Sequence, residues 1–359
     1  MKQFLLAASV LALLAACGDG QPFFEEETTD DTTGDDGSTD GSTDDGSDEG
    51  TNGIPSAQTP ASMDVPTPDS RIVRFEQENE DGGGMLISPV VYDEVNDRFF
   101  VDNMAFDGNN VYQRILGSQM PYSVYEASAT APDALTGDDI RQVTPYSAIV
   151  GVSRNRSTNS DGESVPRTAF AIVRTGGYVD YGFGGFVYQR EGAFEVPTTG
   201  QAIYTGDYGG VRVFEGSSGL EYVDGKAEVR IDFEDFNRNE GVYARVYDRT
   251  ILNPRNGQLN LPTVAVPITV GDGGFDENGE YMNTMSSVFI DPDTGEQAVL
   301  ETGNLYAIIA GDATSGNGGE IVGVVTLTSD DPRTEYSSST ETFETGGFIA
   351  YRGADNFDN

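Results

Sequence analysis

The sequence contains no histidine and no tryptophan, and Cys17 is its single cysteine among 359 residues. Without histidine, the chain excludes hydrolases that rely on a histidine base and metal or haem centres ligated by imidazole. One cysteine excludes an intramolecular disulfide, a zinc cluster built from several cysteines and a CxxC redox pair. Stability must therefore come from ordinary burial, and any catalysis would have to come from carboxylates.

Basic residues are also scarce, because 20 Lys and Arg stand against 60 Asp and Glu, for a formal net charge of −40. Nucleic acid is excluded as a partner, since phosphate binding needs a basic patch. A cationic ligand or a basic protein face stays open, beside the simpler interpretation of an acidic, soluble surface. No pair of catalytic acids stands out among 60, so we predict that the chain is not an enzyme; a carboxylate-based glycosidase is the less favoured alternative.

The N-terminus is typical of a bacterial lipoprotein signal peptide. After a short charged start, residues 4–16 are apolar except for Ser9, a run too short to span a bilayer permanently, and Ala15 and Ala16 precede Cys17. We predict that residues 1–16 are removed and that Cys17 is lipidated; an ordinary secretory signal is the alternative. Because Gly18 rather than aspartate follows the cysteine, we expect a lipid anchor in the outer membrane, with the chain at the cell surface.

Residues 17–70 follow as an acidic segment dominated at first by Asp, Glu, Gly, Ser and Thr, with four prolines between residues 55 and 68. Such a segment offers little apolar surface to offset the entropy of ordering. We predict a disordered tether between the lipid anchor and the folded part of the chain.

The rest of the chain predicts an all-β fold with few helices. Residues 227–233 alternate apolar and charged side chains, as in an antiparallel strand with one face in water. Similar runs are separated by turn-rich segments: 202–214, 221–233, 241–247, 262–270, 281–290, 304–310, 320–327 and 347–351. Eight successive strands favour an up-and-down barrel at residues 196–353, although periodicity alone also allows a sandwich. Glycines beside aromatic residues, as in Tyr208-Gly209-Gly210, mark bulges, corners or places where a ring lies over bare backbone.

A less regular region at residues 71–195 precedes the barrel, with strand-like pieces at 98–106, 146–152, 168–175 and 184–190. We predict a smaller open sheet with long loops there, and a short tail at residues 354–359.

Two acidic segments, 271–280 and 291–296, contain the Asp, Asn, Glu and Gly that a Ca2+ loop uses. Neither meets the EF-hand pattern, and the same residues are common in hairpin turns. We interpret both as turns, with Ca2+ binding as the alternative, and expect no cofactor and no other metal.

The C-terminal region resembles the barrel domain of transferrin-binding protein B-like surface lipoproteins, a group that includes factor H-binding protein-like barrels. Residues 197–206 match the entry strand P-x-x-G-x-A-x-Y-x-G, residues 225–233 match a strand ending D-F, Gly241 opens the next strand, and residues 345–350 match part of the closing strand. The resemblance covers about the last 160 residues. It implies an eight-stranded barrel preceded by a handle sheet, and a role in binding a host protein or solute at the outer membrane. Its ligand-contact residues lie on variable loops, so the ligand-binding residues of this chain stay unknown.

Together these observations predict a membrane-anchored binding lipoprotein that captures a protein or solute, such as a metal carrier, on its barrel loops. An outer-membrane receptor or transporter would then be a second partner. A structural or adhesive surface lipoprotein without a defined solute is the alternative.

Overall fold

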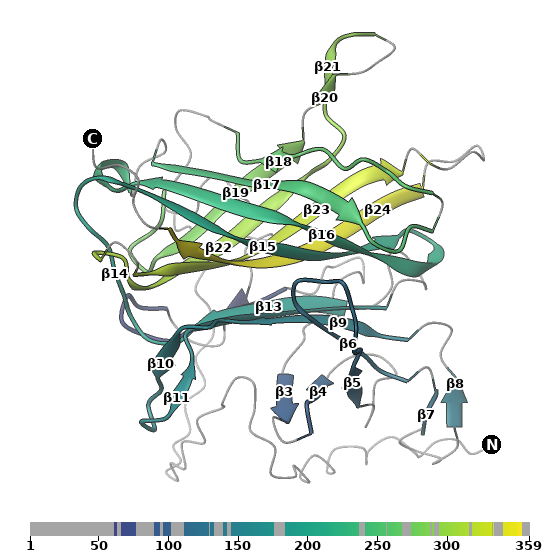
Figure 1. Cartoon of the computed structure of the whole chain (residues 1–359), viewed down its shortest axis with the longest axis horizontal. Coiled ribbons are helices and arrows are strands. Elements are labelled where there is room, and N and C mark those ends of the chain that lie inside the picture. Colours follow the sequence, from purple (N-terminus) through teal and green to yellow (C-terminus); the bar gives the residue numbers. More distant parts are fainter. Residues whose placement is uncertain are drawn as a thin grey trace, which may run out of the picture.

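The computed structural model describes two β-sheet regions stacked on each other (Figure 1). The residues it describes are the following: 61–62, 66–76, 90–93, 96–101, 111–128, 130–132, 139–141, 145–175, 184–236, 241–255, 257–267, 274–287, 289–290, 294–315, 318–331, 333 and 340–353. Within them, no helix has the length and apolar character needed to cross a membrane.

The C-terminal region is a closed barrel of eight antiparallel strands, as the sequence predicts. Its strands are β15 (Gln201–Phe214), β16 (Ser217–Asp232), β17 (Val242–Ile251), β18 (Val264–Ala265), β19 (Glu280–Ser287), β22 (Thr302–Asp312), β23 (Glu320–Asp331) and β24 (Thr340–Arg352). Each pairs with the next, and β24 pairs back with β15, so the sheet has no free edge around the ring. A short strand, β14 (Phe194–Glu195), adds to β22 in parallel, and one 3-10 turn, η2 (Phe233–Asp235), follows β16.

Alternation of side chains along the strands fills the barrel. On β16, Ala227, Val229 and Ile231 are buried in the barrel core, whereas Lys226 before them and Arg230 between the last two are exposed. Side chains from the other strands complete this core: Tyr204, Tyr208, Val246, Phe275, Tyr281, Leu305, Ile309, Val325 and Phe348. The lumen at these strands is therefore packed with side chains, as is typical of an eight-stranded barrel.

The N-terminal region forms a nine-stranded open sheet, here called the handle, in the order β1-β2-β13-β12-β9-β6-β5-β4-β3. Its strands are β1 (Ala61–Ser62), β2 (Ile72–Phe75), β3 (Val90–Asp93), β4 (Arg98–Val101), β5 (Tyr112–Arg114), β6 (Ser123–Glu126), β9 (Ser147–Val152), β12 (Thr168–Arg174) and β13 (Gly184–Arg190). Two short hairpins flank it: β7 (Thr130–Pro132) with β8 (Asp139–Arg141), and β10 (Arg156–Thr158) with β11 (Ser164–Pro166).

The middle strands of the handle lie along one side of the barrel, whereas β3, β4 and β5 lie farther from it (Figure 1). One face of the handle shares a buried apolar cluster with the outer face of β15, β22, β23 and β24. At the centre of this contact, a Cβ atom on Gly347 would lie 2.4 Å from the ring of Phe170, and one on Gly151 would lie 2.2 Å from it. The Phe170 ring thus packs between two bare backbones, which confirms that glycines of this chain provide room for aromatic rings.

Polar contacts also join the handle to the barrel. Arg74 of β2 donates two hydrogen bonds of 2.7 Å to Glu280 of β19. The buried Glu320 of β23 accepts hydrogen bonds of 2.8 Å from the hydroxyls of Ser153 and Thr168. Together with the apolar cluster, these bonds hold the two sheets as a single packed unit.

Several predicted strand boundaries differ from the structure. Within the described residues 262–267 of the strand predicted at 262–270, β18 is the one strand, because Pro262 and Pro267 flank it and cannot donate to the ladder. The strand predicted at 281–290 is two elements: β19 ends at Ser287, and β20 (Phe289–Ile290) pairs instead with β21 (Gln297–Ala298). β1 lies within the range that we assigned to the tether, where it pairs with β2.

Candidate functional site: a charged barrel end beneath a projecting hairpin

One end of the barrel contains a set of buried charges, which we call the charge cluster. Its members come from five strands and two loops: Arg212, Arg249, Arg333, Glu221, Glu301, Glu344 and Asp331. All but Arg333 are at most 4% exposed as whole residues, and the side chain of Arg333 is 8% exposed. Three guanidinium groups thus face four carboxylates inside a barrel that is otherwise apolar.

A β-bulge places Arg249 inside the barrel. On β17, Val246 points inward and Tyr247 outward, but the pairing between β16 and β17 shifts there, so that Asp248 and Arg249 oppose the single residue Gly225. Asp248 has a φ of 52°, the left-handed conformation that a bulge requires. Without the extra residue, strand alternation would put Arg249 on the outer face with Arg245.

Arg249 is the centre of the charge cluster. It donates hydrogen bonds of 2.7 and 2.9 Å to the two oxygens of Glu301 and one of 2.6 Å to Glu344. Burial by itself would lower the pKa of Arg249, but the carboxylates of Glu344 and Glu301 outweigh it and raise that pKa. The guanidinium is therefore a permanent cation that neutralises two buried carboxylates.

Arg333 and Arg212 complete the charge cluster on either side of Glu221. Arg333 donates two hydrogen bonds of 2.9 Å to Glu221 and two of 2.9 Å to Asp331. Burial opposes ionisation of Asp331, yet the hydrogen bonds from Arg333 lower its pKa. Arg212 lies farther from its partners, 3.7 Å from Glu221 and Glu344, and contributes mainly long-range attraction.

Tyr208 lies between the charge cluster and the apolar core of the barrel. Its hydroxyl donates a 2.7 Å hydrogen bond to Glu344, and its ring occupies the space where a Cβ atom of Gly346 would lie, 2.1 Å from the ring. Burial and the adjacent carboxylate raise the pKa of Tyr208 well above its usual value. Tyr208 thus stays a neutral donor that separates the charges from the apolar core.

The charge cluster also holds the connections between strands at this end of the barrel. We call these connections the rim. In the β17–β18 connection, the backbone N–H of Arg255 donates to Glu221 at 2.7 Å and the carbonyl of Pro262 accepts from Arg249 at 3.1 Å. The backbone N–H of Glu301 donates to the hydroxyl of Ser287 at 2.9 Å, which joins the last residue of β19 to the start of β22. Buried ions satisfied in this way hold the rim in a defined shape.

A hairpin, β20–β21, projects from the rim on the side of the barrel away from the handle (Figure 1). Ile290 is 64% exposed and Val299 is 55% exposed. Within the described residues, β20 and β21 pair only with each other. Two apolar side chains of this hairpin are thus exposed to solvent, next to a rim that the charge cluster holds.

Charges on the rim are distributed unevenly. Glu215, Glu296 and Asp330 are exposed, whereas Arg333 is bound within the charge cluster. Arg255 lies with its guanidinium 4.3 Å from the centre of the Phe214 ring and donates to the hydroxyl of Ser217 at 3.0 Å. The rim therefore exposes three carboxylates and one arginine, Arg255, whose guanidinium also contacts its own chain.

The opposite end of the barrel is closed by aromatic rings. Phe236 stacks on Phe275 with ring centres 5.1 Å apart and an interplanar angle of 3°, and Phe275 contacts Tyr281 at 5.3 Å. Nearby, the buried Arg190 donates to the carbonyls of Thr67, Pro68, Ser70, Asn278 and Ile309. Burial lowers the pKa of Arg190 to about 10. This end thus holds residues 67–70, the segment that leads into β2.

The residues singled out in the sequence have different outcomes. Cys17 lies outside the described residues, as do positions 271–273 and 291–293 of the two acidic segments. In the first segment, the Asp276 carboxylate accepts from the backbone N–H groups of Asn278 and Glu280 at 2.8 Å, and Glu280 is bound by Arg74, so these carboxylates shape a turn and a domain contact. The described parts of the chain hold no group of three or more candidate metal ligands.

Comparison with known proteins gives structural neighbours only. No family model and no curated protein matches the chain. A transferrin binding protein B (TbpB) double mutant from Haemophilus parasuis Hp5 aligns with 79% of the chain at 10% identity and a TM-score of 0.34. This chain spans about half of that protein, 51% of its length.

Two further solved structures align over most of their own length. A surface lipoprotein is covered completely, at 10% identity and a TM-score of 0.30. HpuA from Kingella denitrificans, solved in complex with human haemoglobin, is covered to 92%, at 13% identity and a TM-score of 0.32. The motifs of the C-terminal region resemble proteins of this kind. Identities of 10 to 13% assign no ligand to this chain.

Proposed function

We propose that this protein is a membrane-anchored, non-enzymatic lipoprotein of the outer membrane that captures another protein on the rim of its barrel. In this proposal residues 1–16 are removed, Cys17 carries the lipid, and residues 17–70 connect the anchor to the handle. The observation that carries it is the β20–β21 hairpin, which exposes Ile290 and Val299 above a base held by buried ion pairs.

Rigidity of the base supports binding to a partner. A preorganised surface loses less conformational entropy when it binds than a mobile one does. The charge cluster holds the described rim connections at Arg255, Pro262 and Glu301, so these parts have already lost conformational entropy during folding. A protein partner is favoured over a small solute because side chains pack the lumen of the barrel and the exposed apolar residues project outward.

The buried carboxylates support a non-enzymatic role. Glu301 and Glu344 are bound by Arg249, and Glu221 and Asp331 by Arg333. A carboxylate glycosidase needs two acids that reach the glycosidic bond of a bound sugar, whereas these acids are buried and bound to arginines of their own chain. These acids are therefore suited to holding the rim together.

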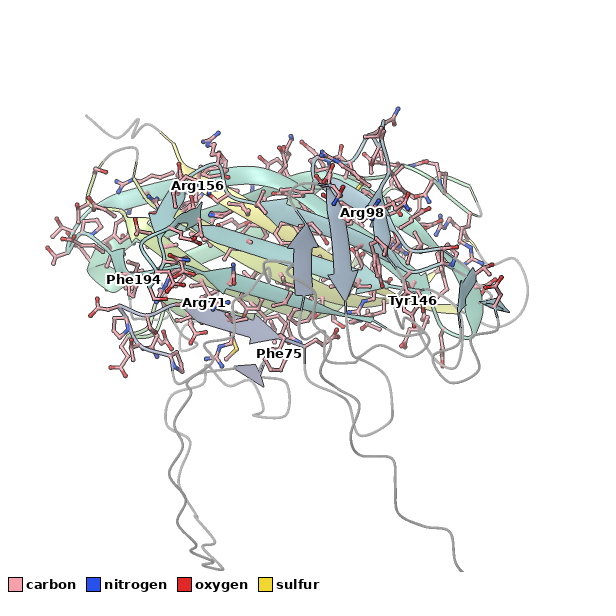
Figure 2. All side chains as sticks on the ribbon, turned by 90° about the horizontal axis from the view of Figure 1, so that it is seen from below. Arg71, Phe75, Arg98, Tyr146, Arg156 and Phe194 are labelled. Atoms are coloured by element: carbon pink, nitrogen blue, oxygen red, sulfur yellow. The ribbon has the colours of Figure 1, made fainter. Side chains whose placement is uncertain are left out.

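The direction in which the hairpin faces supports capture at the cell surface. Arg190 binds the carbonyls of residues 67, 68 and 70 at the aromatic end of the barrel. In the view from the handle side, Arg71 lies toward the end marked by Phe194, and Tyr146 lies toward the other end (Figure 2). Residues 67–70 thus lie on the handle side at one end, whereas the hairpin projects from the rim on the side away from the handle.

Protease treatment of intact cells, followed by immunoblotting for the folded chain, tests the location. We expect the folded chain to be lost from intact cells, and we expect a Cys17→Ala variant to be released from the membrane fraction. Protection of the folded chain until the outer membrane is opened would contradict capture at the cell surface.

A further inference from the structure

The β20–β21 hairpin has an apolar face that its own chain leaves uncovered. Ile290 pairs with Gln297, Val299 directly follows β21, and both apolar side chains are exposed. Two-stranded hairpins are at best marginally stable in water, because they bury little apolar surface. A partner that covers this face would therefore stabilise the hairpin as well as bind it.

Among the exposed charges of the rim named above, three carboxylates stand against one arginine, Arg255. Between Arg255 and Arg333 the sequence has no Lys or Arg over 77 residues, while it has 12 Asp and Glu. This stretch includes β18 to β23 and the whole hairpin. Exposed carboxylates at Glu215, Glu296 and Asp330 lie on the rim, where Arg333 is bound by Glu221 and Asp331.

These charges select the class of partner. A second copy of this chain would bring an equally acidic rim against the first, and a membrane of anionic lipids would also be repelled. A protein surface with lysine and arginine around an apolar centre would satisfy both features, because protein interfaces combine an apolar core with a polar rim. Opposite charges would also speed the encounter of the two proteins.

We propose that the exposed Ile290 and Val299 of the hairpin, together with Glu296 beside them and the exposed carboxylates of Glu215 and Asp330 on the same rim, form a docking surface for a basic protein segment with apolar side chains at its centre. This inference rests on the proposed function and names the partner class for the same site. The apolar residues supply affinity, and the carboxylates supply selectivity and salt dependence.

The probe for this inference is a random 12-residue peptide library displayed on phage and selected against the full chain in lipid nanodiscs. We expect the selected peptides to be enriched in Lys and Arg together with apolar residues. Their affinity is then measured by fluorescence anisotropy for the original chain, for the double variant Ile290→Ser/Val299→Ser and for Glu296→Lys. Val152→Ser is the matched control, because Val152 is 52% exposed on the handle.

We expect the double variant to bind at least about tenfold more weakly, and Glu296→Lys about threefold more weakly. Raising the salt concentration from about 0.05 to 0.5 M should weaken binding several-fold, because it shortens the Debye length. Val152→Ser should bind like the original chain. Thermal unfolding of each variant verifies that the barrel is intact.

Selected peptides without basic enrichment, or with equal affinity for the hairpin double variant, would overturn this inference. Protein capture elsewhere on the rim would still stand in that case. Self-association of the chain that is lost in the double variant would also overturn it, since a second copy would then be the occupant. The proposed function itself is decided separately, by the location of the chain and by its contacts on cells.

Discussion

Replacing Arg249 with methionine should destabilise the barrel strongly. The substitution removes three hydrogen bonds of 2.6 to 2.9 Å and leaves Glu301 and Glu344, which are 1% and 2% exposed, without their main cation. Breaking a buried ion pair on one side costs about 3–5 kcal/mol, because a charge stays buried without compensation. Arg212, at 3.7 Å from Glu344 and 3.9 Å from Glu301, compensates in part, so we expect about 3 kcal/mol.

The same strand supplies a matched control. Arg245 also forms two hydrogen bonds with a glutamate, Glu228, at 3.1 Å, but its side chain is 32% exposed on the outside of the barrel. Arg245→Met should therefore cost about 0–1 kcal/mol, the usual range for exposed ion pairs. The difference between the two variants measures the effect of burial, since residue type and strand are the same.

Urea unfolding followed by tyrosine fluorescence gives the free energies of unfolding, since the chain has 17 tyrosines and no tryptophan. At about 2–4 °C per kcal/mol, Arg249→Met should also lower the melting temperature by about 6–12 °C. The triple variant Arg249→Met/Glu301→Gln/Glu344→Gln should lose less stability than Arg249→Met alone, because it leaves fewer unpaired charges. A loss below about 1 kcal/mol for Arg249→Met would refute the role given to the charge cluster.

Three further predictions concern the bulge, the contact between the sheets and pH. At the bulge, Asp248→Gly should be close to neutral, whereas Asp248→Val should cost about 1–2 kcal/mol in urea unfolding, because φ is 52° there. Gly347→Ala places a methyl group 2.4 Å from the Phe170 ring and should lower stability by about 1–3 kcal/mol, with faster hydrogen exchange in β12 and β24. The lowered pKa of Asp331 means that its contribution is complete above about pH 4 and is lost as pH falls through the lower folded value. Melting temperatures between about pH 2 and 6 should show this loss, and Arg333→Met should reduce it.

The barrel could be predicted from the sequence because its signal is local. Alternating residues such as Ala227, Val229 and Ile231 define one buried face of a strand, and turn-rich segments separate successive strands. Since each barrel strand pairs with a neighbour along the chain, the order of strands follows their order in the sequence. In the handle, β2 pairs with β13 and β6 with β9, and no turn residue encodes such distant pairings.

The candidate site could not be predicted because it depends on an interruption of the pattern. Strict alternation puts Arg249 on the outer face with Arg245, and only the bulge at Asp248 turns it inward. The partners of Arg249 are separated from it by 52 and 95 positions, among 60 acidic residues. One signal of the bulge is present in the sequence. Asp248 interrupts the strand-like run just before Arg249, and Asp tolerates the left-handed conformation that a bulge can use. The sequence did not indicate the hairpin, because Phe289 and Ile290 continue the strand-like run that begins with β19.

Photo-crosslinking on intact cells tests protein capture at the rim most directly. A photoreactive amino acid replaces Ile290 on the hairpin, and the same replacement at Val152 on the handle is the control, because both side chains are exposed. We predict a discrete adduct of the chain with another protein from position 290 after illumination, and no such adduct from position 152. Equal adducts from both positions, or none from position 290 in cells that display the protein, would contradict capture on the rim.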